Sequence, residues 1–139
     1  MSVSTRRLSR EVALQVLFQQ EFSNQQTVEA GLEAFRRSFD AAPEVWEYAH
    51  YLLKGVEQNR PEIDSLIQRS SAHWTLKRMA LVDLNIMRVA TFELKFSQGP
   101  ASSVPPAVAI NEAIEISKKY GTVDSAAFVN GILDQVMKQ

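Results

Sequence analysis

The chain has 139 residues, a formal net charge of −1 and no cysteine. This length suits one domain with a real hydrophobic core, and 45% hydrophobic with 22% charged residues is ordinary globular usage rather than that of a disordered chain. The absence of cysteine excludes disulfide scaffolds, thiolate metal sites and cysteine nucleophiles. Because the net charge is close to zero, any phosphate-binding surface must be local.

The chain shows no sign of a membrane segment. No apolar run approaches the roughly 20 residues that cross a bilayer, and the polar, basic start from Met1 to Arg10 is followed by no signal-peptide core. We therefore expect a cytoplasmic protein with no membrane partner.

Helical periodicity dominates the first half of the chain. A wide apolar face predicts a heavily buried first helix. Thr27 is placed to cap the second helix. Pro43 and Pro61 suit the first turns of the third and fourth helices. The predicted helices are Thr5–Phe22, 27–41, 43–59 and a shorter one from Pro61. Ser70 to Ala72 then separate the two halves.

The second half is also helical. Residues 74–96 form one long helical stretch with a candidate break near Leu81, and the proline-rich segment 97–106 is a loop. A helix from Pro106 ends at Gly121, which is placed to adopt the left-handed conformation. Asp124 or Ser125 caps the last helix. The fold class is all-α: one domain, 1–139, built as a compact bundle of about seven helices in two helical subdomains, 1–70 and 71–139.

Asn130-Gly131 is usually a turn dipeptide, yet it lies within the helical period of the last helix. We expect Gly131 to permit the close approach of another helix.

No arrangement of residues predicts catalysis. The two histidines, His50 and His73, lie apart, and neither is near an HExxH spacing, a nucleophile elbow or a glycine-rich phosphate loop. We assign His50 no role. The sequence predicts no enzyme, no metal site and no cofactor.

The N-terminus is the first candidate binding site. Arg6, Arg7 and Arg10 precede any acidic residue and, on a helix, can face one phosphate backbone. Three contacts to single-stranded RNA give a log–log salt slope of roughly −2, which base stacking or a partner must supplement. The alternative is an ordinary solvated start of the chain.

A second candidate lies before Gly121. Lys118, Lys119 and Tyr120 supply two cations and an aromatic ring, which suit a phosphate or a splayed base. Spacing alone equally allows Tyr120 to be a core residue.

Longer motifs carry a resemblance. They are Arg-x-x-x-Arg-Glu-x-Ala-x-Gln-x-Leu-Phe at 6–18, Trp-x-Leu-x-Arg-Met at 74–79, Ile-Met-Arg-Val-Ala-x-Phe-Glu-Leu at 86–94, Val-Pro-Pro-Ala-Val-Ala-Ile-Asn-Glu-Ala-Ile-Glu-Ile-Ser-Lys-Lys-Tyr-Gly at 104–121, Asp-Ser at 124–125 and Phe-Val-Asn-Gly-Ile-Leu-Asp at 128–134. Together they resemble the NusB family of transcription antitermination factors over nearly the whole chain, most weakly between residues 23 and 59.

The resemblance implies an adaptor. NusB proteins bind the boxA element of nascent ribosomal RNA and pair with NusE, a small-subunit ribosomal protein, within the RNA polymerase antitermination complex. The implied RNA contacts are Arg6, Arg7, Arg10, Arg88, Tyr120, Asp124 and Phe128. Asp83 is the implied contact to NusE, as an acidic rim position that suits a basic protein. Asp124 can accept hydrogen bonds from base amino groups, although capping of the last helix is the favoured role.

Two other interpretations stay open at this stage. A related helical domain precedes the catalytic domain of some ribosomal RNA cytosine methyltransferases, but this chain stops at Gln139 with no cofactor-binding half. The chain could instead be a protein-interaction module or a homodimer whose arginines serve solubility.

Overall fold

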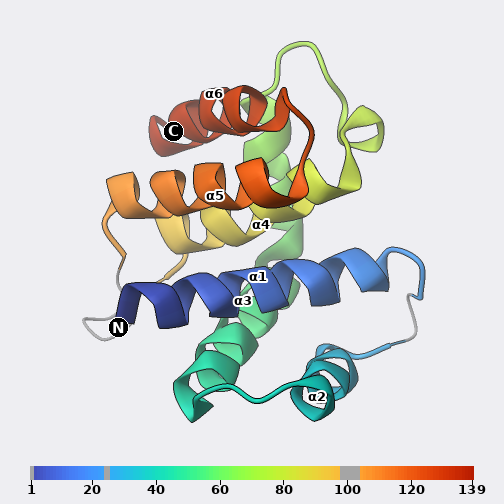
Figure 1. Ribbon diagram of the computed structural model, residues 1–139. Coiled ribbons are helices and arrows are strands. Elements are labelled where there is room, and N and C mark those ends of the chain that lie inside the picture. The colour runs from blue at the N-terminus through green and yellow to red at the C-terminus, as the bar shows by residue number, and fades with distance from the viewer. Residues whose placement is uncertain (1, 24–25, 98–103) are drawn as a thin grey trace. The chain divides into compact units, whose positions relative to one another are not determined.

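Six α-helices and one 3₁₀-helix make up the regular structure of residues 2–23, 26–97 and 104–139, which are the parts described by the computed structural model (Figure 1). Their bounds are α1 Ser2–Gln20, α2 Val28–Ser38, α3 Pro43–Arg69, η1 Leu76–Arg78, α4 Leu81–Lys95, α5 Pro106–Tyr120 and α6 Ser125–Met137. These residues contain no strand, so the all-α class is confirmed. In the same parts of the chain, no helix has both the length and the apolar character that crossing a bilayer requires.

The expected count of about seven helices is wrong because α3 continues through Pro61. The two predicted helices, 43–59 and the one from Pro61, meet at a kink where Asn59 has non-helical angles (φ −116°, ψ 16°). Pro61 lacks the amide proton that the preceding turn needs, and its ring disfavours helical angles just before it. Asn59 Nδ2 donates to the carbonyl oxygen of Gly55 at 2.8 Å, so a side chain bridges the interrupted turn.

The stretch 74–96 is broken near Leu81, as its sequence allowed, and only its second part is α-helical. Met79 and Ala80 are extended (ψ 144° and 136°) between η1 and α4. Met79 is buried, so its apolar side chain belongs to the core without a helix around it. Periodicity alone does not distinguish this connection from a helix.

The chain forms two compact units, Met1–Lys54 and Gly55–Gln139, and the division falls inside α3. We refer to them as unit 1 and unit 2. The predicted subdomains, 1–70 and 71–139, place their boundary at the end of α3 instead and stay a prediction.

Unit 1 contains α1, α2 and the first part of α3. Thr27 caps α2 as predicted, because its Oγ1 accepts from the Ala30 amide at 3.0 Å. α1 is as heavily buried as its apolar face predicted, although Phe22 lies beyond its end and is 72% exposed. The buried core of this unit includes the side chains of Val12, Leu14, Val16, Leu17, Leu32, Trp46, Tyr48, Leu52 and Leu53.

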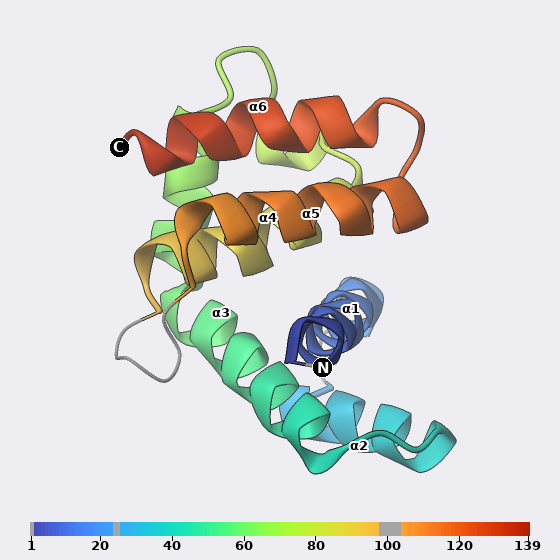
Figure 2. The ribbon, with the colours of Figure 1, turned by 60° about the vertical axis from the view of Figure 1, so that its left-hand side comes forward.

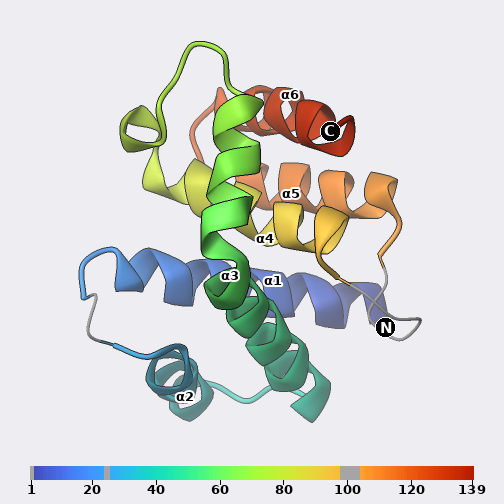
Figure 3. The ribbon, with the colours of Figure 1, turned by 180° about the vertical axis from the view of Figure 1, so that it is seen from behind.

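In unit 2, α4, α5 and α6 pack against one another in pairs (Figure 2), and the second part of α3 lies against α4 (Figure 3). The close approach of α3 to α4 depends on Gly55, because a Cβ there would overlap the ring of Phe92. Gly131 differs from its predicted role: nothing lies within 4 Å of the position of a Cβ, and the residue is exposed. No helix of the described chain therefore requires a glycine at this position, although glycine inside a helix costs about 1 kcal/mol relative to alanine.

These two glycines form a matched pair for a stability test. We expect Gly55→Ala to destabilise the protein by about 1–3 kcal/mol, because overpacking against Phe92 outweighs the gain in helix propensity. Gly131→Ala should stabilise it by up to about 1 kcal/mol, since its Cβ meets open space. Urea unfolding of both variants measures the difference, and equal effects would contradict the packing described.

Candidate nucleic-acid interface

The N-terminal arginines lie on α1, which confirms that their segment is helical. The guanidinium carbon of Arg6 lies 4.1 Å from the centroid of the Tyr48 ring, and that of Arg10 lies 5.8 Å from it. Both distances allow a cation–π interaction. The ring of Tyr48 thus holds two cations of adjacent helical turns in one place.

Two further contacts hold this cation site in position within unit 1. The buried Ser9 hydroxyl donates to the carbonyl oxygen of Val45 at 2.8 Å and joins α1 to α3. Tyr48 stacks on Tyr51 with ring centroids 5.7 Å apart. Sequence reasoning missed Tyr48, although it lies one turn after Val45 on the apolar face of α3.

The three arginines differ in exposure, which their spacing does not show. Arg6 and Arg7 are half-buried, whereas Arg10 is only 5% exposed. A guanidinium in that position mainly orders the site, and the accessible charge comes from Arg6 and Arg7. Contact of the three with phosphate stays a prediction.

The turn between α5 and α6 carries the second candidate site. Gly121 is extended (φ −95°, ψ −165°), so the predicted left-handed conformation is wrong. Glycine is required there for space, because a Cβ would overlap the Ser125 side chain and lie 2.9 Å from the carbonyl oxygen of Ser117. The Thr122 amide donates to the buried Ser125 Oγ at 2.9 Å and closes the turn.

This turn directs its next residues to solvent. Val123 is 95% exposed, and Asp124 is exposed at the N-cap position of α6 without a side-chain capping bond. The favoured capping role of Asp124 is therefore wrong, because Ser125 closes the turn instead. Tyr120 is half-buried, and Lys119 Nζ lies 5.3 Å from the centroid of its ring. A cation, a ring and a carboxylate thus occur within the six residues 119–124.

Phe128 lies one turn into α6 and is half-buried. Its ring meets that of Trp74 edge to face, with centroids 6.5 Å apart and an interplanar angle of 86°. The guanidinium carbon of Arg78 lies 5.5 Å from the centroid of the Trp74 ring. Sequence reasoning noted Trp74 and Arg78 only as part of a family motif.

Arg88 differs from the implied RNA contact because it is buried, at 7% exposure, and bound within unit 2. Its Nε and Nη2 donate to the two carboxylate oxygens of Asp64 at 2.8 and 3.0 Å, and Nη1 donates to Asn85 Oδ1 at 3.0 Å. These bonds satisfy the guanidinium and join α3 to α4. The structure gives Arg88 a structural role, and we leave it out of the RNA surface proposed below.

Asp83 is not the rim residue that the resemblance implied, since it is only 8% exposed in the first turn of α4. Its Oδ1 is buried and has no hydrogen-bond partner in the described parts of the chain. An unsatisfied buried carboxylate oxygen is costly, although the helix N-terminus favours its charge.

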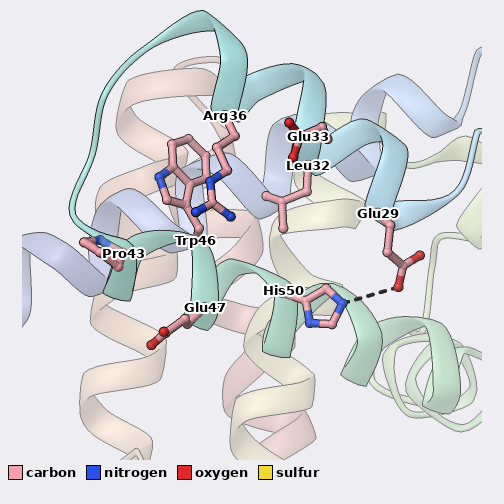
Figure 4. Close-up of a pocket in the computed structure, with 8 residues that line it drawn as sticks. All are labelled: Glu29, Leu32, Glu33, Arg36, Pro43, Trp46, Glu47 and His50. Carbon is pink, nitrogen blue, oxygen red and sulfur yellow. Dashed lines mark hydrogen bonds and ion pairs between the residues drawn. The ribbon is translucent and has the colours of Figure 1, made fainter.

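A surface hollow of about 380 Å³ lies between α2 and α3 in unit 1 (Figure 4). Leu32 and Trp46 contribute its apolar lining, and His50 Nε2 lies 3.3 Å from Glu29 Oε2 at its rim. The pKa of Glu29 lies below its ordinary value because a backbone amide, His50 and Lys54 all favour the carboxylate. The carboxylates of Glu29, Glu33 and Glu47 make this hollow unsuited to phosphate. Among the described residues, no three histidine, aspartate or glutamate side chains are arranged so that they could hold a metal ion.

Comparison with known proteins points to one family. The model of the NusB family matches residues 7–138. A transcription antitermination protein NusB from Bdellovibrio bacteriovorus is 52% identical over 138 residues, covering 99% of this chain and 98% of that protein. One from Trichlorobacter lovleyi is 46% identical, covering 94% of this chain and 89% of that protein.

Solved structures agree with the sequence comparison. The structure of T. maritima NusB has a TM-score of 0.85 and 40% identity, covering 96% of this chain and 91% of that one. A crystal structure of antitermination factors NusB and NusE in complex with dsRNA has a TM-score of 0.83 and 25% identity, covering 97% of both chains.

The structural role of Arg88 is open to direct test. We expect Arg88→Met to destabilise the protein by about 3 kcal/mol, because Asp64 and Asn85 lose their donor in a largely buried site. The control is Lys118→Met, which breaks an exposed pair with Glu115 and should cost less than about 1 kcal/mol. Both are measured by urea unfolding. Equal stability of the two variants would show that Arg88 is not structural.

Proposed function

Because this chain belongs to the NusB family, as its motifs predicted, we propose that it is a transcription antitermination factor that binds boxA RNA of nascent ribosomal transcripts together with NusE. In this proposal it acts as an adaptor that helps RNA polymerase read through terminators. It works in the cytoplasm, where nascent transcripts are found in bacteria.

The observation that carries the RNA-binding part is the cation site on α1. Arg6 and Arg7 are partly accessible, and the buried Arg10 shares the ring of Tyr48 with Arg6, in a chain whose net charge is −1. A helix preorganises these charges, so less side-chain entropy is lost when they contact phosphate. Similarity to a protein solved with NusE and RNA supports the same interpretation.

The strand we propose is unpaired, although the RNA in that related complex is double-stranded. Tyr120 and Phe128 offer partly exposed rings, and Asp124 offers an exposed acceptor for base amino groups. Rings of this kind stack only on bases that have left a duplex, and acceptors of this kind read base edges. A duplex would leave these groups unused.

Asp83 supports the partnership with a basic protein. Its Oδ1 lacks a donor within the described chain, so a cationic side chain that reaches it would satisfy the oxygen. NusE, as a ribosomal protein, is the partner proposed to supply it. Because Asp83 is buried, this contact requires α4 or the partner to adjust on binding.

The rival interpretations have less support. The relatives bear the name of an antitermination protein rather than that of an enzyme, and this chain spans nearly their full length. A homodimer is compatible with the proposal, because dimerisation does not need the arginines and leaves them available for RNA.

The test of the proposal is RNA binding with and without NusE. We expect single-stranded boxA RNA to bind more tightly when NusE is present, because two weak surfaces on one strand raise the effective concentration. A gel-shift titration measures it, with a scrambled single strand and a boxA duplex as controls. RNA affinity that is low in every arm and unchanged by NusE would show that the adaptor mechanism is mistaken.

The cation site has its own prediction. Arg6→Ala with Arg7→Ala should weaken RNA binding and reduce the log–log salt slope by about 1.4, since two phosphate contacts to a single strand are lost. The charge-matched control is Arg36→Ala with Arg37→Ala, which removes two exposed arginines of α2. Circular dichroism verifies that both variants stay helical. An equal loss in both would indicate a general charge effect rather than a site.

A further inference from the structure

We propose that Trp74, Lys77, Arg78, Phe128 and Gly131 form a second RNA contact, in which one unpaired base stacks on Trp74. We call this surface the Trp74 platform. It lies entirely in unit 2 and combines the connection between α3 and α4 with one face of α6. This inference rests on the proposed function, because it names a further part of the path that the same RNA takes.

The exposure of Trp74 is the first observation. The residue is 45% exposed, whereas the other tryptophan of the chain, Trp46, is 5% exposed. Because part of this large ring is open to solvent, a ligand that covers it gains the free energy of burying apolar surface. The edge-to-face contact with Phe128 fixes the orientation of the ring. A fixed, partly open ring is what base stacking needs, because little entropy is lost on binding.

The charge around Trp74 favours a nucleic acid. No acidic residue occurs between Asp64 and Asp83, while Lys77 and Arg78 on η1 are exposed. Arg78 lies over the Trp74 ring, so its cation and the stacking surface belong to the same site. Two cations beside a ring can hold the phosphates on either side of a stacked base.

Gly131 is the independent observation. It lies one helical turn after Phe128, on the same face of α6, and is exposed with open space at the position of a Cβ. Packing within the described chain gives no reason for this destabilising residue. Close approach of an external ligand gives such a reason, because a helix surface without a side chain lets a sugar or base lie against the backbone.

Asp124 precedes Phe128 by one turn and continues the same face of α6. Its exposed carboxylate accepts hydrogen bonds, and the amino groups of adenine, cytosine and guanine supply donors. The face therefore offers an acceptor, a ring and an open backbone in succession. This order suits an unpaired ribonucleotide strand better than a basic peptide, which two adjacent cations would repel.

The platform is tested by fluorescence and affinity with single-stranded boxA RNA and NusE. Stacking should quench Trp74, so RNA should lower the tryptophan emission of the wild type but not that of Trp74→Phe, which retains a ring and most of the affinity. Trp74→Leu removes the ring and should weaken binding roughly tenfold. Phe22→Leu, which replaces another exposed aromatic residue, is the matched control and should bind as the wild type does.

Gly131→Ala separates binding from folding. We expect a more stable protein that binds RNA several-fold more weakly, and no purely structural role of Gly131 produces that combination.

Two results would overturn the platform and leave the proposed function standing. The first is RNA affinity that is unchanged in both Trp74→Leu and Gly131→Ala but reduced in the variant that lacks Arg6 and Arg7. The second is a Trp74→Leu variant that binds RNA normally but NusE weakly, since the surface would then be a protein contact. Absence of RNA binding by the wild type, with and without NusE, would instead refute the proposed function.

Discussion

Unit 2 depends on the ion pair between Arg88 and Asp64. The pair joins the second part of α3 to α4, with both carboxylate oxygens bound and the third nitrogen satisfied by Asn85. An arginine that is 7% exposed is tolerated only because its donors are used. Since α5 and α6 both pack on α4, the position of the α5–α6 turn and its polar residues follows from this contact.

Charge in this chain is arranged locally rather than globally. Acidic and basic residues nearly balance, yet α1 carries three arginines before its first acidic residue, and residues 65–82 contain no acidic residue. The hollow between α2 and α3 is acidic instead, because three glutamates and one arginine line it. A protein with this distribution attracts phosphate at chosen places without binding nucleic acid over its whole surface.

Three glycines of the chain show that one residue type serves different physical needs. Gly55 makes room for the ring of Phe92, and Gly121 makes room for the Ser125 side chain in a tight turn. Gly131 has open space at the position of a Cβ, so packing within the described chain does not require a glycine there, and contact with a ligand is the role we propose for it. In the sequence these positions look alike, because spacing shows where a glycine stands but not what lies opposite it.

The sequence by itself determined the all-helical class, the cap at Thr27, the start of α5 at Pro106 and the placement of the arginines on a helix, because periodicity, capping and helix starts are local properties of the chain. Only the tertiary structure decided which charges are accessible. Arg10, Arg88 and Asp83 look like surface residues by type, yet all three are buried, since burial depends on helices that are distant in the sequence. The same reason explains why Tyr48 and Trp74 went unassigned: the partners that give them a role, Arg6 and Phe128, lie more than 40 residues away in the chain.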